Sequence, residues 1–311
     1  MKRLLSFSYA ALVLILLNAC TPEAEGDRAG EYETALRGTA EILCDEQIMG
    51  LMAPVKELYD SVHPEAHVTL KAVSGYDAVI ELMAHRTRGI VLAREWLPQE
   101  DTIIREKEGA DGFPRTLIAK DALVFFASKD FPIDTLNSED IKAWLSGGTV
   151  DMRVYPALKQ KPVFLVPGPT SSIYANITNV VNKGLEPPKG SVSSLSSMDS
   201  VKMAVRSDPT LIGVGYLSQF ANDSSVKMLR LSFIDKDGQY RRPKPVHAAY
   251  LIQGLYPFPV PIYIVLRDRV NNYSLPSGFM LYVARDAKAQ RKINDAGIEA
   301  GYARYELNLS E

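Results

Sequence analysis

Cysteine and histidine are scarce in this chain of 311 residues, which has two of the first and four of the second. If Cys20 is modified, as argued below, Cys44 is left alone and no internal disulfide can form. His63 and His67 are four residues apart, but Pro64 disfavours a helix that would present both on one face. We therefore expect no metal site and no cofactor, and a fold stabilised by its hydrophobic core.

Catalytic and nucleic-acid-binding patterns are also missing. The sequence has no Gly-x-Ser-x-Gly motif of the kind that presents a hydrolase nucleophile. Gly213-Val214-Gly215 lacks the third glycine and the acidic residue of a dinucleotide site. With 35 Lys and Arg against 37 Asp and Glu, the net charge is −2, which is unlike the basic surface of a nucleic-acid binder. We expect neither an enzyme nor a nucleic-acid partner.

Long apolar runs are lacking beyond the N-terminus, since none approaches the roughly 20 residues of a membrane-spanning helix. The N-terminus has two cations, Lys2 and Arg3, followed by the apolar segment Leu4–Leu17. Leu17 is also the first residue of the tetrapeptide Leu-Asn-Ala-Cys, which ends at Cys20. This pattern resembles a bacterial lipobox. It predicts a signal peptide over residues 1–19, cleavage before Cys20 and a lipid on the Cys20 thiol. The alternative is a plain signal peptide that ends near a cysteine. Either one predicts an extracytoplasmic protein, and the lipid would anchor it to a membrane, in the periplasm or at the cell surface.

The rest of the chain reads as a tether followed by a folded body. Residues 20–37 are polar and acidic without a period, which predicts a flexible tether. From Gly38 onward, short apolar runs alternate with amphipathic stretches, which predicts an α/β fold with a parallel sheet. Strands are expected at 40–44, 68–73, 89–93, 122–128, 163–166, 211–217 and 260–266. Helices are expected at 47–62, 76–85, 137–146, after 172, and at 197–207, 277–283 and 286–296.

Five segments in a fixed order resemble a known family, the phosphate-binding members of the type-2 periplasmic solute-binding proteins. These are the extracytoplasmic receptors of phosphate ABC transporters. The segments are Ile118–Phe126, Asp134–Ile141 with Leu145-Ser146-Gly147, Gly213–Ser218, Tyr256-Pro257 with Pro261–Ile264, and Gln290–Ile293 with Ala296-Gly297.

The resemblance implies an α/β fold of two lobes joined by two crossovers. Lobe one would comprise residues 38–118 and 250–311, and lobe two residues 119–249. The solute would bind in the cleft between the lobes, which would close by a hinge motion. The implied function is to capture phosphate or a similar oxyanion and deliver it to the permease of an ABC importer. Such a receptor acts as a monomer and does no chemistry of its own.

A tetrahedral oxyanion is bound by backbone N–H groups at helix N-termini, hydroxyl groups and a guanidinium. Four segments offer such groups, and each also has an ordinary structural interpretation. The candidates are Asp45, Glu46 and Gln47 after the first strand; Ser74 and Gly75 after the second; Arg94 after the third; and Thr170, Ser171 and Ser172 in the Gly-Pro-Thr-Ser-Ser turn. Helix capping is the alternative for the turns, and an ion pair with Glu95 or another acid is the alternative for Arg94.

The chain departs from the family pattern in two places. The first turn, Asp45-Glu46-Gln47, stands where the family usually carries glycine, serine and threonine. The family arginine a few residues before Gly168 is missing, since Leu165 and its neighbours are uncharged. Either Arg94 takes over that role or the ligand is not phosphate. The same fold could therefore serve a sensor or scaffold lipoprotein with a different ligand, and a secreted phosphoester hydrolase is the third alternative.

Overall fold

The computed structural model describes residues 33–235, 237–267 and 273–301. The predicted signal peptide, Cys20 and most of the predicted tether lie outside the described residues. Within those ranges, no helix is both long enough and apolar enough to cross a membrane.

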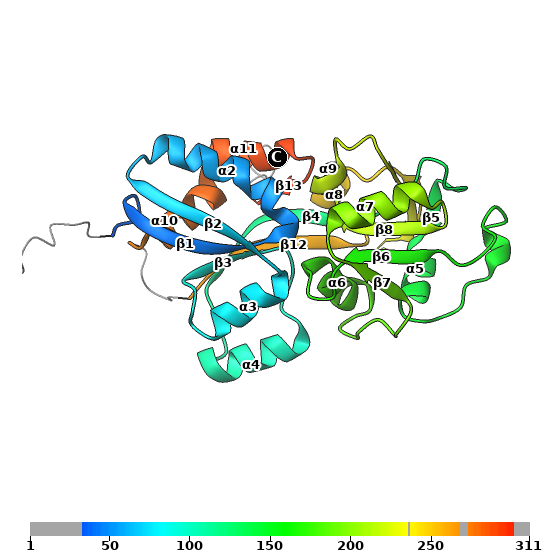
Figure 1. The fold of residues 1–311 in the computed structure, drawn as a ribbon, viewed down its shortest axis with the longest axis horizontal. Helices are drawn as coiled ribbons and strands as arrows, with labels where there is room; N and C mark the ends of the chain where they lie inside the picture. The colour runs from blue at the N-terminus through cyan, green and yellow to red at the C-terminus, as the bar shows by residue number, and fades with distance from the viewer. Residues whose placement is uncertain (1–32, 236, 268–272, 302–311) are drawn as a thin grey trace, which may run out of the picture.

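The main sheet runs in the order β2 (Ala66–Val73), β1 (Gly38–Asp45), β3 (Gly89–Leu92), β12 (Pro259–Leu266), β4 (Arg115–Ala127), β8 (Leu211–Tyr216), β6 (Val163–Pro167) and β7 (Val192–Leu195). Two short strands also pair with β4: β13 (Glu299–Ala300) in its middle and β9 (Lys227–Met228) at its carboxyl end. We use lobe one for the half formed around β1, β2 and β3, and lobe two for the half formed around β6, β7 and β8. Figure 1 shows the two halves side by side, with β4 and β12 passing between them.

Lobe one begins with three parallel strands whose carboxyl ends share one edge of the sheet. β1 pairs in parallel with β2 on one side and with β3 on the other. Its elements are β1 (Gly38–Asp45), η1 (Glu46–Ile48), α2 (Met49–Val62), β2 (Ala66–Val73), α3 (Gly75–Met83), β3 (Gly89–Leu92) and α4 (Pro98–Glu108). The C-terminal helices α10 (Leu275–Arg285) and α11 (Ala287–Asp295) return to lobe one, where α11 packs on α2 (Figure 1).

Two long strands connect the lobes. β4 (Arg115–Ala127) pairs antiparallel with β12 (Pro259–Leu266) up to Ala122, and from Leu123 onward it pairs antiparallel with β8. The sheet is therefore mixed rather than parallel throughout, because both connecting strands run against their neighbours. The predicted two-lobed α/β fold with two crossovers is confirmed, whereas the exact residue boundaries of the lobes stay a prediction.

Lobe two has a three-stranded parallel group, in which β6 pairs with both β7 and β8. A second small sheet, β11-β10-β5, packs beside it. The elements are β5 (Thr135–Asn137), α5 (Ser138–Leu145), η2 (Met152–Val154), β6 (Val163–Pro167), α6 (Ser172–Asn176), η3 (Ile177–Val181), β7 (Val192–Leu195), α7 (Met198–Ser207), β8 (Leu211–Tyr216), α8 (Leu217–Phe220), β9 (Lys227–Met228), β10 (Arg230–Ile234), β11 (Tyr240–Lys244) and α9 (Ala248–Ile252). β13 (Glu299–Ala300), the last described strand, follows α11 and pairs with β4.

Polar side chains begin the helices that the sequence predicted. The Asn137 side chain accepts the N–H of Glu139 at 2.8 Å at the start of α5, and Ser197 accepts the N–H of Ser200 at 3.2 Å at the start of α7. Gly147 ends the α5 segment at a φ of +80°, a conformation that favours glycine. Cys44 lies in β1 as a buried free thiol.

Candidate functional site

The candidate residues at the ends of β1, β2 and β3 meet lobe two at one place. A Cβ on Gly75, at the start of α3, would lie 3.0 Å from the Cβ of Ser172 at the start of α6. The N–H of Tyr76 donates to the carbonyl of Thr170 at 3.1 Å. Because parallel strands end at the same edge of a sheet, the turns that follow them are brought together. The structure therefore joins four separate segments of the sequence at the boundary between the lobes.

Asp45 ends β1 and is fully buried at this boundary. Its Oδ1 accepts the N–H of Gln47 at 3.1 Å, and its Oδ2 accepts the N–H of Ala93 at 3.3 Å. Burial raises the pKa of the Asp45 carboxyl, and the hydroxyl of Ser172, the two backbone N–H groups and the charge of Arg94 oppose that rise. The capping interpretation and the site interpretation of Asp45 are therefore compatible, because one carboxylate does both.

Arg94 lies two residues beyond β3, and its side chain is 1% exposed. Its Nη1 and Nη2 donate to the two carboxylate oxygens of Glu100 at 2.6 and 2.8 Å. The same two nitrogens donate to the carbonyls of Glu95 at 3.0 Å and Gly75 at 3.2 Å, whereas the buried Nε has no hydrogen-bond partner. The ionic partner is thus Glu100 in the first turn of α4, a helix that the sequence analysis did not predict.

The remaining candidates cap helices or lie at the surface, except Gln47, which is buried. Ser74 accepts the N–H of Asp77 at 3.1 Å, and Ser171 accepts that of Tyr174 at 3.2 Å, so both cap helices. The side chains of Glu46 and Thr170 are exposed, and Gln47 is buried with its carbonyl bonded to the side chain of Gln219 at 2.8 Å. Of the nine candidates, Asp45, Gly75, Arg94 and Ser172 come from four separate segments and interact with one another.

Two buried residues of lobe two complete the boundary and were not among the candidates. The Nδ2 of Asn176 donates to the carbonyl of Ala93 at 2.7 Å and to the hydroxyl of Tyr216 at 2.8 Å. The Tyr216 hydroxyl lies 2.8 Å from the Oγ of Ser172. Burial and the nearby Asp45 raise the pKa of Tyr216 well above its usual value, so Tyr216 is a neutral hydrogen-bond donor. Tyr216 belongs to the Gly-x-Gly-Tyr-x-Ser segment of the family resemblance, so this segment was the sequence signal that could have identified Tyr216 as a site residue.

A second fully buried carboxyl, Asp121, lies in β4 next to the point where that strand changes partners. Its Oδ1 accepts the N–H groups of Ala122 at 2.7 Å and Ser218 at 3.2 Å. Burial outweighs these hydrogen bonds and raises the pKa of Asp121 to about 6. This group belongs to the connection between the lobes rather than to the cluster around Asp45.

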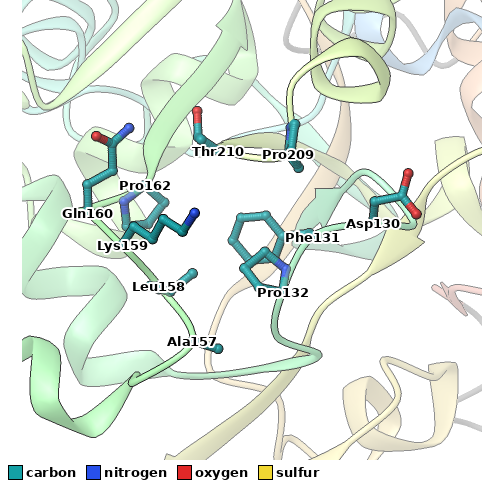
Figure 2. Close-up of a pocket in the computed structure, with 10 residues that line it drawn as sticks. All are labelled: Asp130, Phe131, Pro132, Ala157, Leu158, Lys159, Gln160, Pro162, Pro209 and Thr210. Carbon is teal, nitrogen blue, oxygen red and sulfur yellow. The ribbon is translucent and has the colours of Figure 1, made fainter.

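A cavity of about 410 Å³ lies elsewhere, on lobe two (Figure 2). Figure 2 shows that three prolines, Leu158 and Phe131 make most of its wall, with Lys159 as the single cation among the ten lining residues. An oxyanion needs several converging donors, which this lining does not offer. None of the candidate residues lines it. Among the described residues, no group of three or more His, Cys, Asp and Glu side chains is placed to hold a metal ion.

Several solved structures with the same fold are described as substrate-binding proteins or transport receptors. One, from Clostridium perfringens, is described as a phosphate ABC transporter substrate-binding protein with bound phosphate; the TM-score is 0.67 at 14% identity, over 85% of this chain and 99% of that one. An ABC-type phosphate transport receptor from Vibrio cholerae matches at a TM-score of 0.62 and 15% identity, over 84% and 99% of the two chains. PstS from Borrelia burgdorferi matches at 0.54 and 16%, over 85% and 99%.

Comparisons that use the sequence alone do not identify such relatives. No protein-family model matches it, and a search of curated proteins finds no match. The structural likeness, at 14–16% identity, shows that this chain has the two-lobed fold of these solute-binding proteins.

Proposed function

We propose that this protein is an extracytoplasmic solute-binding protein that captures an oxyanion between its two lobes and delivers it to an ABC importer. Phosphate is the first candidate ligand, and a lipid on Cys20 would hold the protein at the membrane where the permease lies. The observation that carries the proposal is the buried carboxylate of Asp45. At the boundary between the lobes, a negative group is held by donors from separate segments of the chain.

The donors around Asp45, rather than the carboxylate itself, suit an oxyanion. A buried anion is costly unless hydrogen bonds and a nearby positive charge replace its water. The N–H groups of Gln47 and Ala93, the hydroxyl of Ser172 and the charge of Arg94 supply that replacement. Donors of these kinds suit a tetrahedral oxyanion, and they lie at the carboxyl edge of the strands, where open α/β sheets bind ligands.

One observation favours the alternative that this fold serves a sensor or scaffold lipoprotein with a different ligand. Both Nη atoms of Arg94 are taken by Glu100, so the guanidinium charge is already balanced within lobe one. The lobes are also joined directly, by hydrogen bonds such as that from the side chain of Asn179 to the carbonyl of Trp96 at 3.1 Å. In that function, the closed arrangement of the lobes would itself be the state that a partner recognises.

Calorimetric titration of the full-length chain with phosphate, sulfate and molybdate separates the two functions. As an oxyanion receptor, the protein should bind phosphate with a dissociation constant below about 1 mM, which is a binding free energy stronger than about 4 kcal/mol. Absence of heat with all three anions at concentrations well above that value would contradict the receptor function and leave the sensor or scaffold function. A phosphatase assay on the same sample should show no turnover, because the described residues offer neither a metal cluster nor a nucleophile elbow.

The proposed anchor has its own test. Cys20→Ser should move the protein from the membrane fraction to the soluble fraction and abolish incorporation of labelled fatty acid, because the lipidated thiol is lost. Cys44→Ala is the matched control, since it removes the other cysteine and should leave the protein on the membrane. Membrane attachment that survives in Cys20→Ser protein from which residues 1–19 have been removed would show that the anchor is not this lipid.

A further inference from the structure

The carboxylate of Asp45 is held on both sides by backbone groups of lobe one. The N–H of Gln47, in η1, meets its Oδ1 at 3.1 Å, and the N–H of Ala93, just after β3, meets its Oδ2 at 3.3 Å. The side chain is fully buried. Two separate elements therefore present N–H groups to a single negative group.

Lobe two directs a chain of hydrogen bonds to the same carboxylate. Asn176 donates to the oxygen of Tyr216 at 2.8 Å, and the single Tyr216 proton lies between the Oγ of Ser172 at 2.8 Å and the carbonyl of Ala93 at 3.1 Å. The shorter contact is to Ser172. The Ser172 hydroxyl, whose oxygen accepts from Tyr216, opposes the rise in the pKa of Asp45. Lobe two thus acts on the carboxylate through Ser172.

The charged and titratable groups around Asp45 are few. Arg94, after β3, is the cation near it; Cys44 precedes it in β1; Tyr216 faces it from β8; and Glu100, in α4, lies beyond Arg94. Burial and the charge of Asp45 raise the pKa of the Cys44 thiol, so Cys44 stays neutral as Tyr216 does. Arg94 also carries the one buried nitrogen here, Nε, that has no partner. The N–H groups of Gln47 and Ala93 thus donate to Asp45, whereas the Nη atoms of Arg94 donate to Glu100.

We propose that Asp45 controls anion binding at the boundary between the lobes: its carboxylate fills the position that an oxyanion would take, so an oxyanion binds only by displacing it. The inference rests on the proposed function, in that it assigns the donors around Asp45 to the oxyanion site. A free anion and the carboxylate need the same N–H and hydroxyl groups, and two negative charges at one buried position repel each other. The two lobes therefore close over Asp45 without a solute, and the carboxylate of Asp45 determines how tightly an oxyanion binds.

The test compares sulfate binding by the full-length chain and by Asp45→Ser. Sulfate is the probe because its charge does not change between pH 5 and pH 8, so any pH dependence belongs to the protein. Asp45→Ser removes the carboxylate, and we expect it to bind sulfate at least about tenfold more tightly, which is about 1.4 kcal/mol. Asp101→Asn is the matched control, because it removes an exposed carboxylate that pairs with Arg105 on α4 and should leave sulfate affinity unchanged.

The pH dependence provides a second measurement. Burial raises the pKa of Asp45, and its protonated form no longer repels an anion. Sulfate affinity of the wild-type chain should therefore rise more than that of Asp45→Ser as the pH falls from 8 to 5, because Asp121, with a pKa of about 6, titrates in both proteins. Asp45→Asn keeps the shape of the side chain without its charge. It should give a smaller gain than Asp45→Ser, and it serves as the test variant if Asp45→Ser does not fold.

The outcomes separate this inference from the proposed function. If wild type binds phosphate and Asp45→Ser binds sulfate more tightly than wild type does, both stand. If wild type binds no anion but Asp45→Ser binds sulfate, the inference stands and the receptor function fails. If wild type binds sulfate as tightly as Asp45→Ser and with the same pH dependence, the inference is overturned while the receptor function stands. If neither protein binds an anion, both are overturned.

Discussion

Replacing Arg94 with alanine is expected to lower the free energy of unfolding by about 3–5 kcal/mol, because the change leaves the Glu100 carboxylate buried without its partner. The two side chains are 1% and 7% exposed and form two short hydrogen bonds at 2.6 and 2.8 Å. Glu100 also accepts the N–H of Leu97 at 2.8 Å at the start of α4, so loss of the ion pair should loosen that helix as well. Denaturant unfolding followed by circular dichroism measures the change.

Two further variants show whether the cost comes from the unpaired charge. Arg94→Met combined with Glu100→Leu removes both charges and should recover most of the loss, because replacing a buried ion pair with apolar side chains is often neutral. Arg105→Ala removes an exposed arginine that pairs with Asp101, and its unfolding midpoint should stay near that of wild type. A loss for Arg94→Ala no larger than that for Arg105→Ala would contradict a structural role and favour Arg94 as a ligand-binding residue.

Replacing Asp121 with asparagine is expected to stabilise the protein by about 1–3 kcal/mol at pH 7.5. The native pKa of Asp121 is about 6, against 3.8 for an ordinary aspartate. The native state therefore holds the proton more tightly than the unfolded chain does. Since one pKa unit corresponds to about 1.4 kcal/mol, ionised Asp121 costs about 3 kcal/mol in the folded protein above pH 6. Asparagine keeps an oxygen to accept the N–H groups of Ala122 and Ser218 without that charge.

The stability difference between Asp121→Asn and wild type should depend on pH. The stability that the protonated group provides is fully present below pH 3.8 and is lost as the pH rises through about 6. The advantage of Asp121→Asn over wild type should thus be near zero at pH 4 and reach its full size by pH 7.5. Asp101→Asn, the exposed control, should show no such growth. An advantage of Asp121→Asn that is constant over this range would mean that the ionisation of Asp121 does not cause it.

Most of the elements were predictable because their signals are local. Apolar runs predicted β1, β6 and β12, and the capping residues Asn137 and Ser197 predicted the starts of α5 and α7. The helix α4 was missed because its sequence, PQEDTIIREKE, has almost no apolar face. The small sheet was missed because β5 pairs with β10, with Thr135 opposite Arg230, and such distant pairing leaves no local pattern.

The site was predictable only in part, for a related reason. The meeting of Asp45, Gly75 and Arg94 follows from parallel strands whose ends share an edge. The contributions of Asn176 and Tyr216 depend on how the two lobes approach each other, which no local pattern contains. The partner of Arg94 is Glu100 rather than the adjacent Glu95, because the turn into α4 brings the more distant acid to the guanidinium.

The position of β12 in the sheet also has a consequence for how the protein is made. β12 lies between β3 and β4 and pairs with both, although it follows them by well over a hundred residues. A chain that emerges from its N-terminus first exposes the unpaired edges of β3 and β4 until β12 arrives, and α10 and α11 arrive later still. Lobe one, although it contains the first strands, is therefore completed last. Truncation anywhere before β12 should leave an aggregating chain rather than half a protein.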